Sequence, residues 1–99
     1  MLYPSIDYYF IKKAALILNA LDHKLRQQII RILVERTTIS VTEIYLQLQI
    51  EQAVTSQHLA ILRRAGIVST KRVGRLIYYT INPARIKAIE NFASNIIKC

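Results

Sequence analysis

The sequence has 99 residues, 53% of them hydrophobic, with 14 Lys and Arg against 6 Asp and Glu, for a net charge of +8. This length and composition indicate a single domain over residues 1–99. No run approaches the roughly 18 apolar residues that cross a bilayer, and the only cysteine, Cys99, excludes an internal disulfide. We therefore expect a cytoplasmic protein with no membrane contact, whose positive charge favours a polyanionic partner.

The positive charge is concentrated in the second half of the chain. Residues 1–50 carry a net charge of +2 and residues 51–99 a net charge of +6. Between Arg63 and Lys87 there are seven basic residues and no acidic one. Because a solvated surface normally intersperses both signs, this asymmetry favours a binding surface.

The first expected helix, about residues 5–20, is apolar over much of its circumference. It carries two adjoining apolar stripes, to which Phe10, Ile11 and Ala14 belong. One stripe can face the core of the domain, whereas the second would remain in water in a monomer. We therefore expect this helix to take part in a subunit interface.

Two more helices are expected before residue 51. Residues 22–36 have apolar residues at helical spacing, with Asp22 as the expected N-cap. Residues 42–50 alternate apolar and polar side chains, but their position between two helices favours a helix. A tight turn near Gln49 then leads into the next helix and completes a helix-turn-helix over about residues 42–65.

The stretch "EQAVTSQHLAILRRAG", residues 51–66, divides cleanly on a helical wheel. Its polar half has short neutral side chains at the front and two arginines at the back, and its other half is mostly apolar. Arginines suit the C-terminal end of a helix dipole, which is their ordinary explanation. The neutral front is unusual for a solvated face, and glutamine can pair bidentately with adenine in a major groove. The front therefore indicates a base-reading surface.

After Gly66, a helix C-cap, the pattern changes to a period of two. "IVSTKRV" and "LIYYTIN" flank Gly74 and Arg75 and predict a two-stranded hairpin over about residues 67–81. Asn82 and Pro83 then begin a last helix over about 83–98, whose expected buried stripe contains Ile86, Ile89, Ala93 and Ile96. The predicted fold is thus mainly α (α+β), five helices and a two-stranded β-hairpin wing in the order ααααββα.

These residues resemble the ArsR/SmtB family of winged helix-turn-helix transcriptional regulators. "ALDHKLRQQIIRIL" is similar to the second-helix pattern of that family, "QAVTSQHLAILRRAGIV" to its recognition helix and "VGRLIYY" to its wing. The resemblance implies a homodimer that places this helix in successive major grooves of double-stranded DNA, with the wing on the backbone or minor groove. Two departures are tolerable: Lys24 stands where proline is frequent, and Gln49 stands where the turn often has glycine.

Carried over by position, the resemblance implies roles for individual residues. Base reading falls to Gln52, Ala53, Ser56 and Gln57. Backbone and wing contacts fall to Lys71, Arg72 and Arg75, and further phosphate contacts to Arg63, Arg64, Lys24 and Arg26. The dimer interface falls to the first and last helices, with Phe10, Ile11, Ala14, Ile86, Ile89 and Ala93.

The chain lacks the residues with which many family members bind metal or arsenic. "SVTEIYLQLQ" has no cysteine, and residues 84–99 offer only Glu90 and Cys99. A soft-metal site needs several converging thiolates or imidazoles. We therefore expect no metal and no cofactor, and we interpret His58, on the inner side of its helix, as structural rather than as a ligand or pH switch.

Taken together, the sequence predicts a cytoplasmic, homodimeric transcriptional regulator, a repressor that binds a pseudo-palindromic operator. A winged-helix module that binds another protein, or that coats DNA without sequence preference, is the alternative; coating would favour Lys and Arg on the front of residues 52–57. An enzyme is disfavoured because no nucleophile–base pair, carboxylate pair or phosphate loop is discernible.

Overall fold

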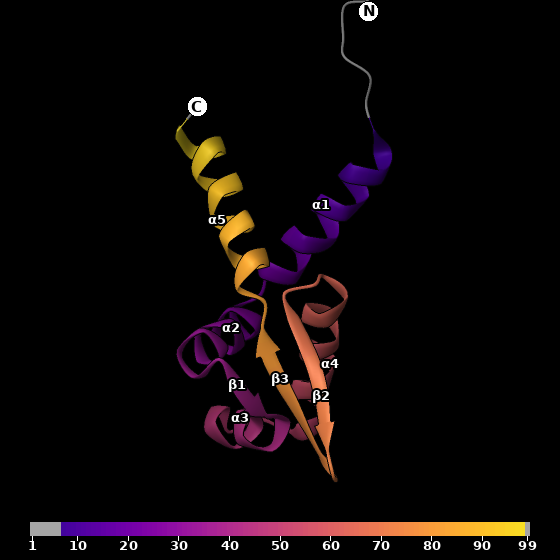
Figure 1. Cartoon of the computed structure of the whole chain (residues 1–99), viewed down its shortest axis with the longest axis vertical. Coiled ribbons are helices and arrows are strands. Elements are labelled where there is room, and N and C mark those ends of the chain that lie inside the picture. Colours follow the sequence, from indigo (N-terminus) through magenta and orange to yellow (C-terminus); the bar gives the residue numbers. More distant parts are fainter. Residues whose placement is uncertain (1–6, 99) are drawn as a thin grey trace, which may run out of the picture.

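The computed structural model describes residues 7–98 and contains five helices and a three-stranded antiparallel sheet (Figure 1). The strand order in the sheet is β1-β3-β2. The fold is a winged helix, as predicted. Its elements in chain order are α1 (Tyr8–Leu21), α2 (Lys24–Arg36), β1 (Thr38–Ser40), α3 (Val41–Leu48), α4 (Gln52–Arg64), β2 (Val68–Val73), β3 (Leu76–Ile81) and α5 (Pro83–Lys98).

The third strand, β1, was not predicted. Its three residues pair antiparallel with β3, with Ile39 opposite Tyr79. At one end of this pairing the hydroxyls of Thr38 and Thr80 lie 3.0 Å apart in a hydrogen bond. Three residues are too few to show the alternation of side chains by which a strand is predicted from sequence. The strand forms because β3 has a free edge with unpaired backbone groups on the side away from β2. The predicted two-stranded wing is therefore one side of a three-stranded sheet.

Side-chain caps set the starts of the helices. The Ser40 Oγ accepts a 3.2 Å hydrogen bond from the Glu43 amide at the start of α3, and the Asn82 Oδ1 accepts one of the same length from the Arg85 amide at the start of α5. The prediction for α2 was wrong: its N-cap is His23, whose Nδ1 accepts from the Leu25 amide at 3.0 Å. Asp22 instead ends α1, with its amide donating to the Asn19 carbonyl.

The core lies where α2, α3 and α4 pack against the sheet. Its largest fully buried side chains share apolar or weakly polar character, and they come from every element between α2 and the start of β2: Ile29, Leu33, Ile39, Ile44, Thr55, Leu59, Leu62 and Ile67. The apolar half predicted for residues 51–66 is thus the half that packs inward. Its burial fixes which face of α4 is left for solvent.

The first and last helices project from this body. Figure 1 shows α1 and α5 diverging at one end of the molecule, with the tip of the β2–β3 hairpin at the other. The molecule measures 56 × 25 × 21 Å and has a radius of gyration of 15.6 Å, against about 13 Å for a compact chain of this length. In α1 only Ala20 is buried, and Ile96 of the expected buried stripe in α5 is 57% exposed. These helices therefore lack a full set of packing partners within one chain.

Candidate nucleic-acid interface

The exposed side of α4 carries the four residues assigned to base reading. Gln52, Ala53, Ser56 and Gln57 are all exposed, and we call them the reading face. Between them in sequence, Thr55 is fully buried, and its hydroxyl donates to the Glu51 carbonyl at 3.0 Å. The reading face is therefore held by the burial of the opposite side of the same helix.

The turn between α3 and α4 depends on a left-handed residue. Gln49 has φ 56° and ψ 45°, the left-handed conformation that glycine adopts most easily. Its amide donates to Leu46, and the Ile50 amide donates to the Tyr45 carbonyl at 3.2 Å. These bonds satisfy carbonyls at the end of α3 and fix the direction in which α4 starts.

The wing is the β2–β3 hairpin. Val73 pairs with Leu76, and Gly74, at φ +62°, forms the tip together with Arg75. Lys71, Arg72 and Arg75 are exposed, as expected. Because successive strand residues point to opposite faces, Lys71 and Arg72 extend to different sides of the hairpin. The wing can therefore contact a DNA backbone from two sides rather than through one row of cations.

Arg63 and Arg64 lie far from the wing tip. They are exposed at the C-terminal end of α4, where they line a hollow together with Lys13 of α1 and Arg85 of α5. Arg63 follows Gln52 by eleven positions in the same helix, which corresponds to about 16 Å along the axis. The predicted group of backbone contacts is thus divided between two ends of the domain.

Arg26, a predicted phosphate contact, is buried, and that assignment was wrong. Its side chain is 6% exposed, and its guanidinium donates to the carbonyls of Ala20 and Asn19, both at 2.8 Å. It thereby caps the C-terminal end of α1. A third bond, of 3.1 Å, joins its Nη1 to the Nδ1 of His58 in α4.

His58 is therefore a structural residue of the interface between α2 and α4, as expected. Because a guanidinium only donates, the Nδ1 of His58 must accept, and the ring proton lies on Nε2. The ring of His23 lies 4.5 Å away, centroid to centroid. Burial lowers the pKa of His58, and the neighbouring charges of His23 and Arg26 lower it further.

No three His, Cys, Asp or Glu side chains cluster as metal ligands within residues 7–98. Cys99 lies outside the described residues. No helix in the same part of the chain is long and apolar enough to cross a membrane.

Two apolar residues lie beside the expected dimer residues: Leu18, which belongs to the second apolar stripe of the first helix but was not assigned to the interface, and Phe92, which sequence reasoning missed. Leu18 is 52% exposed and Phe92 is 50% exposed, and both line a groove between α1 and α5 with Phe10, Ala14 and Ile89. Helical spacing could have found them, because Leu18 follows Ala14 by four residues and Phe92 follows Ile89 by three. Ile86 differs from the others because it lines a separate hollow next to Val34 and Ile81.

A helix-turn-helix with an exposed neutral front, joined to a basic β-hairpin, defines a winged-helix DNA-binding domain. Residues 23–70 match the family described as bacterial regulatory protein, arsR family. The chain belongs to this ArsR family and is a DNA-binding transcriptional regulator. Members of the family bind DNA and are not generally enzymes.

Three relatives illustrate the membership. The transcriptional activator HlyU of Vibrio cholerae is 36% identical over 77 residues, covering 78% of this chain and 70% of HlyU. The transcriptional repressor PagR of Bacillus anthracis is 31% identical over 85 residues, covering 86% of this chain and 85% of PagR. The biofilm growth-associated repressor of Xylella fastidiosa is 35% identical over 79 residues, covering 80% and 68%.

Solved structures of two of these relatives have the same fold. The HlyU structure superimposes with a TM-score of 0.71 at 33% identity, covering 86% of this chain and 91% of that one. The PagR structure superimposes with a TM-score of 0.70 at 29% identity, covering 88% and 99%.

Proposed function

We propose that this regulator is a cytoplasmic homodimeric repressor that binds a pseudo-palindromic operator and reads its bases through Gln52, Ala53, Ser56 and Gln57. The observation that carries the proposal is the exposed reading face, which is neutral in a chain of net charge +8. Non-specific coating needs cations against phosphates, whereas amides and small side chains suit base edges. Gln57 is the residue we expect to pair bidentately with adenine, because a glutamine amide can donate to N7 and accept from N6 of that base at the same time.

The basic residues supply the DNA backbone contacts in this proposal. Lys71, Arg72 and Arg75 of the wing hold the domain against phosphates or the minor groove, and Arg63 and Arg64 serve as outer contacts. Such contacts set register and affinity but carry no sequence information. The wing residues are exposed and have no acidic partner among the ion pairs of the described residues.

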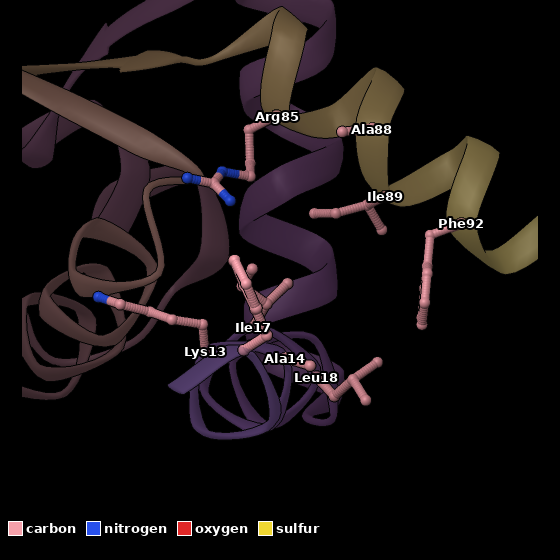
Figure 2. Close-up of a pocket in the computed structure, with 9 residues that line it drawn as sticks. Lys13, Ala14, Ile17, Leu18, Arg85, Ala88, Ile89 and Phe92 are labelled. Carbon is pink, nitrogen blue, oxygen red and sulfur yellow. The ribbon is translucent and has the colours of Figure 1, made fainter. Parts of the chain in front are cut away.

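The dimer is proposed to form through α1 and α5. Figure 2 shows Leu18, Ile89 and Phe92 around the apolar groove between these helices, which has a volume of about 280 Å³. Large apolar side chains stay in water in one chain: Phe10 is 68% exposed and Ile97 is 80% exposed. Exposed apolar patches of this kind mark interaction sites. A second copy supplies matching helices and covers both patches at once by two-fold symmetry.

Repression is the direction we propose for this regulator. Of the three relatives described above, two are named repressors and one is named an activator. A dimer that covers a promoter blocks transcription without any further contact. A promoter–reporter fusion checks this point, since deletion of the regulator should raise expression, and a fall would make it an activator.

Two substitutions test the proposed division between reading and backbone contact. Gln57→Ala should cost about 1–3 kcal/mol on a duplex selected for tight binding and little on a scrambled duplex. Arg75→Ala should weaken binding to both duplexes alike and reduce the salt slope by about one per lost phosphate contact, hence about two per dimer. Binding isotherms at several salt concentrations separate the two effects.

Gln28→Ala is the matched control, because Gln28 is an exposed glutamine on α2 outside the reading face. It should leave both isotherms unchanged. If Gln57→Ala lost equal affinity on both duplexes, the reading face would not recognise bases, and DNA coating would be the better account.

A further inference from the structure

Four basic side chains from three helices surround one hollow, which we call the basic hollow. Arg63 and Arg64 end α4, Lys13 lies in the middle of α1, and Arg85 lies in the first turn of α5. The hollow has a volume of about 390 Å³. No acidic side chain lines it.

The four cations have no acidic partner within the described part of the chain. The ion pairs there are Arg31–Glu35 and Arg36–Glu43, both outside the basic hollow. Like charges around one concave surface raise the local potential and concentrate anions. The carbonyls at the end of α4 offset only part of this charge, because a helix C-terminus corresponds to about half an elementary charge.

The guanidinium of Arg85 packs against a glycine at the hollow. Gly66 has φ +73°, and a Cβ built on it would lie 3.0 Å from the Nη2 and 3.3 Å from the Nε of Arg85. The absence of a side chain at Gly66 therefore makes room for the half-buried guanidinium. Figure 2 shows the side chains of Arg85 and Lys13 extending to the same side, away from Leu18 and Phe92.

The remaining wall of the basic hollow is apolar and aromatic. It is formed by α1, through Tyr9, Leu16 and Ile17. Phe10 also borders the hollow, but it belongs to the proposed dimer interface and is not needed for the site. The volume falls within the range of about 300–1,000 Å³ that small-molecule sites occupy. Cations and apolar side chains thus share one hollow, with the Lys13 Nζ 5.7 Å from the centre of the Tyr9 ring, which matches a ligand that has an anionic group on an apolar or aromatic body.

We propose that the basic hollow binds a small organic phosphate. Arginine forks match phosphate oxygens bidentately, and a phosphate monoester carries close to two negative charges at neutral pH. A DNA phosphate is the alternative source of the same group, but it brings no apolar body to the α1 wall. The proposal goes beyond the function proposed above and does not depend on it, since the binding is measured on protein without DNA. It gives Arg63 and Arg64 a second role, because in the DNA complex the same two residues serve as outer backbone contacts.

Titration of phenyl phosphate into the DNA-free protein, followed by amide NMR shifts, tests the proposal. We expect saturable shifts centred on Lys13 and Gly66, with phenol and inorganic phosphate each binding more weakly than the joined compound. Lys13→Gln and Arg64→Gln should each weaken binding by about tenfold, the value of one charge-assisted hydrogen bond. Both residues are exposed, so the fold should persist, which circular dichroism checks.

Arg31→Gln is the matched control, because it removes the same charge from an exposed site on α2. It should leave the affinity for phenyl phosphate unchanged. An equal loss of affinity for phenyl phosphate in Arg31→Gln would show that binding depends only on the net charge of the protein. An absence of saturable shifts would overturn the proposal. If phenyl phosphate fails to bind while Lys13→Gln lowers the salt slope of DNA binding, the basic hollow is a DNA backbone contact and the small-ligand proposal is wrong.

Discussion

Thr37 stores backbone strain at the junction between α2 and β1. It has φ 68° and ψ −53°, close to a γ-turn conformation that is rare and strained for a residue with a branched side chain. Its amide donates to the Leu33 carbonyl at 2.7 Å, and its carbonyl accepts from the Ile81 amide at 3.1 Å. Both bonds are made by backbone atoms alone. The fold therefore requires this backbone conformation at residue 37 but does not require the threonine side chain.

Replacing Thr37 with glycine should therefore stabilise the protein. Relief of the strain outweighs the extra entropy that glycine gains in the unfolded chain, for a net gain of about 1 kcal/mol in the free energy of unfolding. Urea unfolding at a fixed protein concentration measures it. Thr38→Gly is the control, because Thr38 lies in β1 and its hydroxyl bonds to Thr80; this change should destabilise. A loss of stability in Thr37→Gly would show that its conformation is not strained.

At the scale of elements, the helices with strong periodicity were predictable from sequence, and so was the exposed half of α4. The tight turn near Gln49 was predictable as well. Properties that depend on several segments meeting were not predictable. Arg26 looks like a surface cation in sequence, but it is buried because the C-terminal end of α1 and His58, in the middle of α4, supply its partners. The basic hollow is likewise invisible in sequence, since Lys13 and Arg85 are 72 residues apart in the numbering.

The junction of α2 and α4 makes stability depend on pH. The folded-state pKa of His58 is lowered by burial and by the charges of His23 and Arg26, so the unfolded chain takes up this proton first as the pH falls. The free energy of unfolding should therefore be constant well above the ordinary histidine pKa of about 6.5 and should decrease as the pH falls through that value. Protonation also removes the acceptor for Arg26.

Urea unfolding between about pH 5.5 and 8 measures this decrease. Histidine side chains titrate within this pH window, whereas the ordinary pKa values of carboxyl groups lie below it. In His58→Gln an amide oxygen can still accept from Arg26, but the titrating group is gone. The variant should show a smaller decrease than the natural sequence. The same decrease in both proteins would exclude His58 as its source.

At the scale of the whole molecule, the projecting helices predict self-association. Sedimentation equilibrium at micromolar concentration should give the mass of a dimer, because the groove between α1 and α5 is apolar and open in one chain. Phe92→Glu should shift the equilibrium toward monomer, since it places a charge in that groove, whereas Val73→Glu, on an exposed site next to the wing tip, should not. A stable monomer of the natural sequence would remove the basis for operator symmetry.

Metal should not regulate this protein. The positions where many family members hold metal or arsenic lack the needed thiolates and imidazoles, and a soft-metal site requires several of them. Titration of Zn²⁺ or arsenite into the DNA complex should leave its affinity unchanged. A tenfold loss at stoichiometric metal would reveal a site, and a Cys99→Ser variant would show whether the cysteine takes part in it.

Selection from a library of random duplexes tests the central claim, that a dimer reads bases through the neutral front of α4. The natural sequence should enrich two inverted half-sites whose centres lie about one helical turn, or a multiple of it, apart. Gln57→Ala should enrich the same half-sites with one position in each relaxed. A library that stays random, a single unsymmetrical site, or an unchanged motif in Gln57→Ala would contradict the account.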